Sequence, residues 1–157
     1  MKFLITKDLA HSQLLAYLMA GVLIAIFLYL CLDVVLHSYV IGTDMTEIHT
    51  TLFGNEETFE EPILIDSLLL QVHIDLFMTI FVLVILAAIY IRLHNATVSM
   101  KWILHTLFIL GLAAPLLLLG AYFWAEAFVL VWAGSFLLWH LLAFWVCLSI
   151  FPRLKFR

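Results

Sequence analysis

Charged residues are scarce in this chain of 157 residues: Lys, Arg, Asp and Glu together make up 11% of it. A water-soluble domain of this size needs far more charge to cover its surface. Hydrophobic residues instead make up 66% of the sequence, and the mean hydropathy is +1.18. The composition therefore excludes a soluble globular protein, and it predicts an integral membrane protein with a single domain over residues 1–157.

Cysteine, glycine and cationic residues are also few, and each shortage excludes a class of function. Of the two cysteines, Cys31 falls near the outer end of the first apolar run and Cys147 near the inner end of the last, so they cannot form a disulfide within the chain. No glycine-rich phosphate loop and no pairing of a nucleophile with a base is visible. The 7 Lys and Arg residues form no patch for nucleic acid. These features leave open whether the chain is an enzyme.

Long apolar stretches make up most of the remaining sequence. A helix needs about 20 residues to cross the hydrocarbon of a bilayer. The stretches do not alternate in polarity as the strands of a membrane barrel do. We therefore predict an all-α integral membrane four-helix bundle. Its spans cover about residues 12–38, 64–92, 101–123 and 126–151.

The cationic residues indicate how the bundle is oriented. With four spans, both termini and the loop after the second span lie on one side of the membrane. All 7 Lys and Arg fall on that side: Lys2, Lys7, Arg92, Lys101, Arg153, Lys155 and Arg157. By the positive-inside rule that side is cytoplasmic. We predict a bacterial inner-membrane protein with N- and C-termini in the cytoplasm and the acidic 41–66 loop in the periplasm.

The 41–66 loop contains a pattern typical of a short amphipathic helix. Asp44 can cap its start and Gly54 can close its end. Apolar positions in between recur with helical spacing, together with one histidine: Met45, Ile48, His49, Leu52 and Phe53. The pattern predicts a helix on the outer membrane surface, with His49 on its apolar face and directed toward the bundle.

Histidine is the most informative residue type, and one histidine falls in each predicted span: His37, His73, His105 and His140. Ionisable groups inside a membrane are costly and usually face the bundle interior, so each is a candidate site residue. The rise per residue places His37 about 35 Å and His73 about 28 Å from the inner edge. His105 then lies about 6 Å and His140 about 20 Å from that edge.

Helical spacing groups the outer residues. Asp33 and His37 are one turn apart and share a face, as do Asp66 and His73, which are two turns apart. His73 and Asp75 are two residues apart and point in nearly opposite directions, so Asp75 is left out of the group. The spacing predicts an outer cluster of Asp33, His37, His73 and Asp66, with His49 reaching it as a lid ligand.

One histidine per span resembles the general plan of four-helix membrane cytochromes b. The resemblance rests on topology and on histidine placement, with His37 and His73 at one level. It implies a cytochrome b-like electron-transfer protein that binds one or two haem b groups. His37 and His73 would hold the outer haem, and His105 and His140 the inner one. A quinone or a periplasmic redox protein would then be the electron-exchange partner.

Two other functions are compatible with the same residues. The outer cluster of Asp33, His37, His49, Asp66 and His73 supplies mixed oxygen and nitrogen ligands, which suit a copper, zinc or non-haem iron ion. A cofactor-free structural subunit of a larger membrane complex is the other alternative. In each case we expect membrane lipid to surround the bundle, together with other membrane subunits or further copies of the chain.

Overall fold

A computed structural model of the chain describes residues 13–94, 97–124 and 127–154. Four helices are long and apolar enough to cross a membrane: α1 (Gln13–Val40), α3 (Ile65–Leu93), α4 (Val98–Phe123) and α5 (Ala127–Ile150). A short helix, α2 (Met45–Phe53), precedes α3, and a 3-10 turn, η2 (Phe151–Arg153), follows α5. The described residues contain no β-strand beyond one isolated bridge. The prediction of a four-helix membrane bundle is confirmed.

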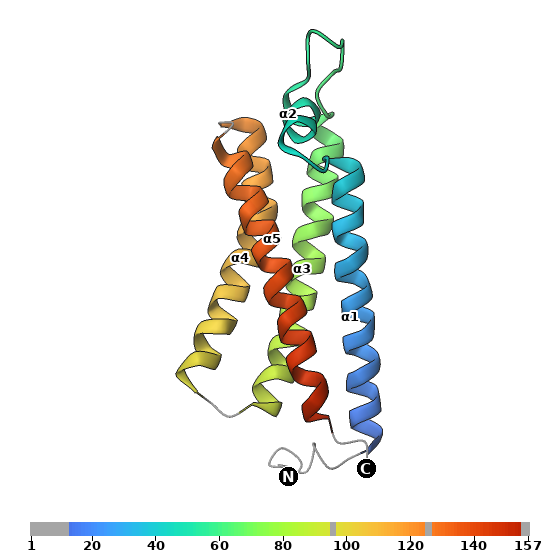
Figure 1. The fold of residues 1–157 in the computed structure, drawn as a ribbon, viewed down its shortest axis with the longest axis vertical. Coiled ribbons are helices and arrows are strands. Elements are labelled where there is room, and N and C mark those ends of the chain that lie inside the picture. The colour runs from blue at the N-terminus through green and yellow to red at the C-terminus, as the bar shows by residue number, and fades with distance from the viewer. Residues whose placement is uncertain (1–12, 95–96, 125–126, 155–157) are drawn as a thin grey trace.

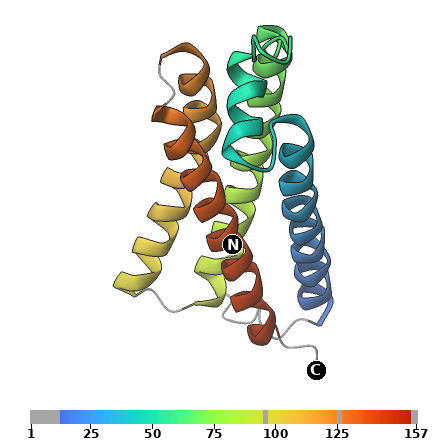
Figure 2. The ribbon, with the colours of Figure 1, turned by 45° about the horizontal axis from the view of Figure 1, so that its top comes forward.

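The four long helices form an uneven bundle (Figure 1). α1 and α3 run side by side, and α5 crosses them at an incline, with α4 on its far side (Figures 1 and 2). α4 and α5 pack most extensively against each other, whereas α1 makes sparse backbone contacts with α3 and α5. The attachment of α1 to the bundle therefore rests heavily on its side chains.

The two ends of the bundle carry opposite charge. Three cations of the described residues, Arg92, Lys101 and Arg153, lie at the end where α3 passes to α4 and where α5 finishes (Figure 1). The guanidinium of Arg153 donates to the carbonyl of Leu93 at 3.4 Å. The predicted cytoplasmic residues Lys2, Lys7, Lys155 and Arg157 lie outside the described residues. The acidic loop with α2 lies at the other end, as the charge pattern predicted.

Helix α2 forms where the sequence predicted it, but its buried face differs. Asp44 caps its start by accepting from the backbone N–H groups of Thr46 and Glu47, at 2.8 and 2.9 Å. The buried residues are Ile48 and Leu52, and His49 is exposed. The prediction that His49 points toward the bundle is therefore wrong. Helix α2 has nine residues, and its two buried residues define the face that packs on the bundle. His49 lies next to that face on the helix surface and is therefore not buried.

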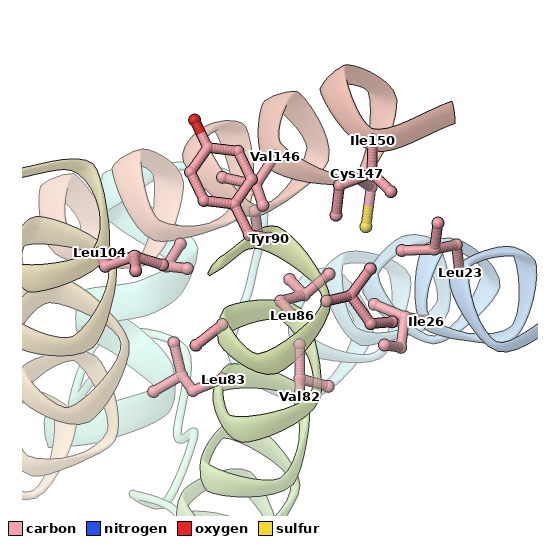
Figure 3. Close-up of a cluster of buried hydrophobic side chains, with 14 of the residues drawn as sticks. Leu23, Ile26, Val82, Leu83, Leu86, Tyr90, Leu104, Val146, Cys147 and Ile150 are labelled. Carbon is pink, nitrogen blue, oxygen red and sulfur yellow. The ribbon is translucent and has the colours of Figure 1, made fainter. Parts of the chain in front are cut away.

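Two apolar clusters fill the interior. In the cluster nearer the cationic end, Leu23 and Ile26 of α1 meet Leu86 of α3 and Cys147 and Ile150 of α5 (Figure 3). The second cluster lies under α2. It contains Ile41, Ile48, Leu52, Leu68, Val72, Leu118, Ala121, Val129 and Trp132. Where these two clusters meet, three of the four long helices, α1, α3 and α5, carry buried polar groups.

Candidate metal centre

A layer of buried polar side chains separates the two apolar clusters. Its members are between 2% and 8% exposed, and they come from α1, α3 and α5. They are Asp33, His37, Asp75, Thr79, Ser135 and His140, and we call this set the polar layer. On α1, the buried positions Leu23, Ile26 and Leu30 recur at helical spacing and lead directly to Asp33 and His37. The ionisable groups thus occupy core positions.

His37 links α1 to α3. Its Nδ1 atom lies 3.0 Å from the backbone carbonyl of Asp33, one turn back on the same helix. Its Nε2 atom lies 3.0 Å from Oδ2 of Asp75. The other carboxylate oxygen of Asp75 accepts from the amide of Gln71 at 2.8 Å. The imidazole is therefore fixed by its own helix at one nitrogen and by a neighbouring helix at the other.

His140 links α5 to α1 in the same way. Its Nδ1 atom lies 2.8 Å from the carbonyl of Phe136, and its Nε2 atom lies 3.0 Å from Oδ2 of Asp33. Asp33 is also close to the ring of His37, at 3.6 Å from Oδ1 to Nδ1. Asp75, His37, Asp33 and His140 therefore form one continuous polar chain across α3, α1 and α5.

These contacts determine how many protons the four hydrogen-bonded side chains hold. A carbonyl oxygen can only accept, so Nδ1 of both His37 and His140 carries a proton. Each Nε2 then faces a carboxylate oxygen, and a hydrogen bond there requires a second proton, on either the ring or the acid. Two imidazoles and two carboxyl groups thus share their protons with no net charge. Charge balance of this kind is what an apolar interior demands.

A small void adjoins this chain. Its volume is about 10 Å³, which is the space of roughly one water molecule. Asp33, His37, Asp75 and Thr79 line it on one side. Pro115 and the rings of Trp132, Phe136 and Trp139 help to close it. One ligand atom each from Asp33, His37 and Asp75 lies within 4.8 Å of the other two. Among the described residues, this is the one such group that could hold a metal ion.

The structure assembles only part of the predicted outer cluster. Asp33 and His37 share a face as expected, but His73, Asp66 and His49 are exposed. Asp75 occupies the place predicted for His73. The sequence correctly indicated that His73 and Asp75 point in opposite directions. The structure places Asp75, and not His73, on the side that faces Asp33 and His37. Leaving out Asp75 was an error, because the buried stripe of α3 runs through Leu68, Val72, Asp75 and Thr79.

The predicted haem pairs are not brought together. His140 was expected to pair with His105, but His105 is exposed, and its Nδ1 atom bonds the carbonyl of Lys101. His140 instead reaches the level of Asp33. Residue counting along single helices could not predict this contact, because it depends on how α1 and α5 pack against each other. His37 is buried while His73 faces outward, so those two rings lie on different surfaces.

Comparison with known families places the chain among membrane proteins. No curated protein and no solved structure matches it. Residues 42–157 match the family Aq_1264_TM, described as a transmembrane helical domain. This segment includes Asp75 and His140, whereas α1, with Asp33 and His37, precedes it. The match covers most of the chain, which therefore belongs to this family of transmembrane helical domains.

Proposed function

We propose that the polar layer binds one divalent transition-metal ion inside the membrane. The proposed ligands are His37 through Nε2 and the carboxylates of Asp33 and Asp75. His140 would orient Asp33 through their hydrogen bond. The observation that carries this proposal is the convergence of three ligand atoms within 4.8 Å, beside a void with room for one small species.

The orientation of His37 supports this assignment. A histidine that ligates a metal usually donates its other ring N–H to a carbonyl or carboxylate, which fixes the tautomer and aims the free nitrogen. His37 makes this bond to the Asp33 carbonyl at 3.0 Å. Tetrahedral ligands about 2.0–2.1 Å from an ion lie about 3.4 Å apart, so a modest contraction of the three ligand atoms would close the site.

The charge and the ligand type of the site limit which metal ions can bind. Two carboxylates offset the charge of one divalent cation, and loss of the proton shared by His37 and Asp75 frees Nε2 of His37 to bind the ion. Mixed nitrogen and oxygen ligands suit zinc, copper(II) or iron(II) better than they suit magnesium or calcium. Haem-based electron transfer has a weaker basis in the geometry, because both Nε2 atoms of the buried histidines already face carboxylates at 3.0 Å.

Substitutions at two nearby positions of α3, the buried Asp75 and the exposed His73, test the proposed metal site. The protein is purified from native membranes, and its metal content is measured by elemental analysis alongside an absorption spectrum. We expect about one ion per chain in the wild type and in His73→Ala, and less than about a tenth of that in Asp75→Asn. Asp75→Glu, which keeps a carboxylate, should retain part of the metal and show that the loss in Asp75→Asn is not a folding defect.

Each outcome is informative. Full metal content in Asp75→Asn contradicts the proposed site. A Soret band that shifts on reduction, and that disappears in His37→Ala or His73→Ala, would support the cytochrome b-like function instead. Neither metal nor haem in any sample would favour a structural subunit, in which the polar layer serves to join helices.

A further inference from the structure

The proposed metal site supplies three protein ligands, and the described residues offer no fourth. Asp33, His37 and Asp75 contribute one ligand atom each. The amide of Gln71 donates to Oδ1 of Asp75 at 2.8 Å, which leaves Oδ2 of that carboxylate for the ion. The Nε2 atom of His140 is engaged with Asp33 at 3.0 Å. Structural metal sites are closed by four protein ligands, whereas a site with three keeps one coordination position open.

The open position faces the small void beside the three ligands. All three ligand residues line this void, whose volume of about 10 Å³ holds roughly one species of the size of water. Ala114, Pro115 and three aromatic side chains form the apolar part of its wall. An ion held between the three ligand atoms would therefore have its fourth coordination position inside a space that admits one small ligand.

One polar group of the void wall takes no part in the metal site. Thr79 lies one turn after Asp75 on α3 and is 4% exposed. Among the described residues, its hydroxyl has no hydrogen-bond partner. No fully enclosed polar side-chain atom of these residues lacks a partner, so the hydroxyl of Thr79 opens onto free space, and the void is the space that Thr79 lines. A polar group this deep in the membrane requires a partner, which a ligand in the void can supply.

Charge indicates which kind of ligand fits the void. The four hydrogen-bonded side chains hold their protons with no net charge. A divalent ion that displaces the proton shared by His37 and Asp75 adds one positive charge, because the proton between His140 and Asp33 stays in place. Apolar surroundings disfavour an uncompensated charge. One monoanion next to the ion restores neutrality.

Given the proposed metal ion, on which this inference depends, we propose that the void binds one monoanion of the size of hydroxide as an exchangeable fourth ligand. The anion contacts the ion on one side and accepts a hydrogen bond from the hydroxyl of Thr79 on the other. Thr79 is thus a positioning residue, and its bond is strengthened by the charge of the acceptor. Hydroxide forms there when a water molecule binds the ion and releases one proton to the solvent. An exchangeable ligand distinguishes a reactive metal centre from one that only joins helices.

The test uses the full chain in detergent micelles, loaded with copper(II) and freed of unbound copper. Fluoride is the probe, because it is a monoanion of the size of hydroxide and its nucleus splits the electron paramagnetic resonance lines of the copper(II) ion that binds it. We expect this splitting in the wild type and in Thr79→Ser, which keeps the hydroxyl. Thr79→Val should raise the dissociation constant of fluoride at least about tenfold, while the copper content stays at about one ion per chain.

Ser135→Ala is the matched control. Ser135 carries another buried hydroxyl of the polar layer, but it donates to the carbonyl of Leu110 at 3.1 Å and does not line the void. Its replacement should leave the dissociation constant of fluoride unchanged. Bound copper without fluoride splitting, or a fluoride affinity that survives Thr79→Val, would overturn the inference and leave the proposed metal site standing. A wild-type chain that retains no copper would contradict the proposed function itself, and this inference with it.

Discussion

At the scale of single residues, the contact between Asp33 and His140 joins two helices that are far apart in the sequence. Asp33 is 8% exposed, and its Oδ2 atom lies 3.0 Å from Nε2 of His140. His140→Ala leaves this buried carboxylate without that partner. Breaking a buried pair costs several kcal/mol in soluble proteins and less within membranes. We expect the free energy of unfolding, measured by chemical denaturation in detergent micelles, to fall by about 1–3 kcal/mol.

His105→Ala is the matched control for this change. His105 is also a histidine in a membrane helix, but it is exposed, and within the described residues its ring bonds one carbonyl of its own helix. Its replacement should change the free energy of unfolding by less than about 0.5 kcal/mol. Equal effects of the two substitutions would mean that the contact with Asp33 contributes nothing specific.

Individual residues were also where the sequence was least informative. Asp33 and His37 could be grouped because one turn separates them, and that spacing is preserved in the structure. The choice between His73 and Asp75 could not be made in the same way. In a soluble helix the polar face identifies the outside, but in a membrane helix the lipid-facing and core-facing surfaces are both apolar. Only the neighbouring helices reveal which side of α3 is buried.

At the scale of helices, close approach depends on a glycine at the level of the polar layer. A Cβ atom at Gly111 of α4 would lie 3.0 Å from Cγ2 of Thr79 on α3 and 3.2 Å from Cε3 of Trp139 on α5. We expect Gly111→Ala to lower the free energy of unfolding by about 1 kcal/mol or more, because it forces these helices apart. Denaturation in detergent micelles measures the change.

Gly134→Ala provides the comparison on α5. No atom of the described residues lies within 4 Å of the Cβ atom that it would add. Alanine is also the better helix former, so this variant should be unchanged or more stable by up to about 1 kcal/mol. If both variants lost the same stability, the effect would come from replacing glycine in general and not from contact with Thr79 and Trp139.

The short helix α2 should respond to pH through Glu47. The backbone N–H and the hydroxyl of Thr43 both donate to Oε2 of Glu47 at 2.7 Å, and these bonds hold the pKa of Glu47 below its ordinary value of 4.5. The stabilisation is therefore present above that value and is lost as the pH falls through the lowered pKa. We expect hydrogen-exchange protection of residues 45–53 to decrease on acidification.

Two variants separate this effect from a general loss of structure in acid. Glu47→Gln should show a smaller change in protection than the wild type between about pH 6 and pH 3, because its side chain does not titrate. Glu57→Gln changes another exposed loop acid and should behave like the wild type. An unchanged pH response in Glu47→Gln would show that its bonds to Thr43 do not stabilise α2.

Helices were far more predictable than the site they build. The ends of all four spans lie within three residues of their predicted positions. Bilayer thickness sets the length of an apolar run directly, and the cap at Asp44 and the turn at Gly54 identify α2 by their chemistry. The contact of His140 with Asp33 was not predictable from residue counting, because it depends on how α1 and α5 pack against each other.

At the scale of the whole molecule, α1 is joined to the bundle by apolar side chains near the cationic end and by the hydrogen bonds of the polar layer. Its backbone contacts with α3 and α5 are sparse, whereas Asp33 and His37 bond one residue on each of those helices. The segment that matches the transmembrane family begins after α1. The proposed metal site lies where α1 meets the matched segment, so it is complete only when α1 is in place.

The orientation of the molecule in the membrane is the remaining prediction, and it rests on charge. Arg92, Lys101 and Arg153 lie at one end, and the acidic loop lies at the other. Moving cations across the bilayer is costly, so the cationic end should face the cytoplasm. Single cysteines at the exposed positions Thr58 and Ser99 can test this with a membrane-impermeant maleimide, once Cys31 and Cys147 are replaced by alanine.

The two reporter positions should react from opposite sides. In right-side-out vesicles, Thr58→Cys should be labelled and Ser99→Cys should be protected, because Ser99 lies in the first turn of α4 at the cationic end. Inverted vesicles should reverse the pattern. Labelling of Ser99→Cys in right-side-out vesicles would place the cationic end outside the cytoplasm. In that case the acidic loop and the nearby polar layer would lie closer to the cytoplasmic surface, and any metal would be taken up from the opposite compartment.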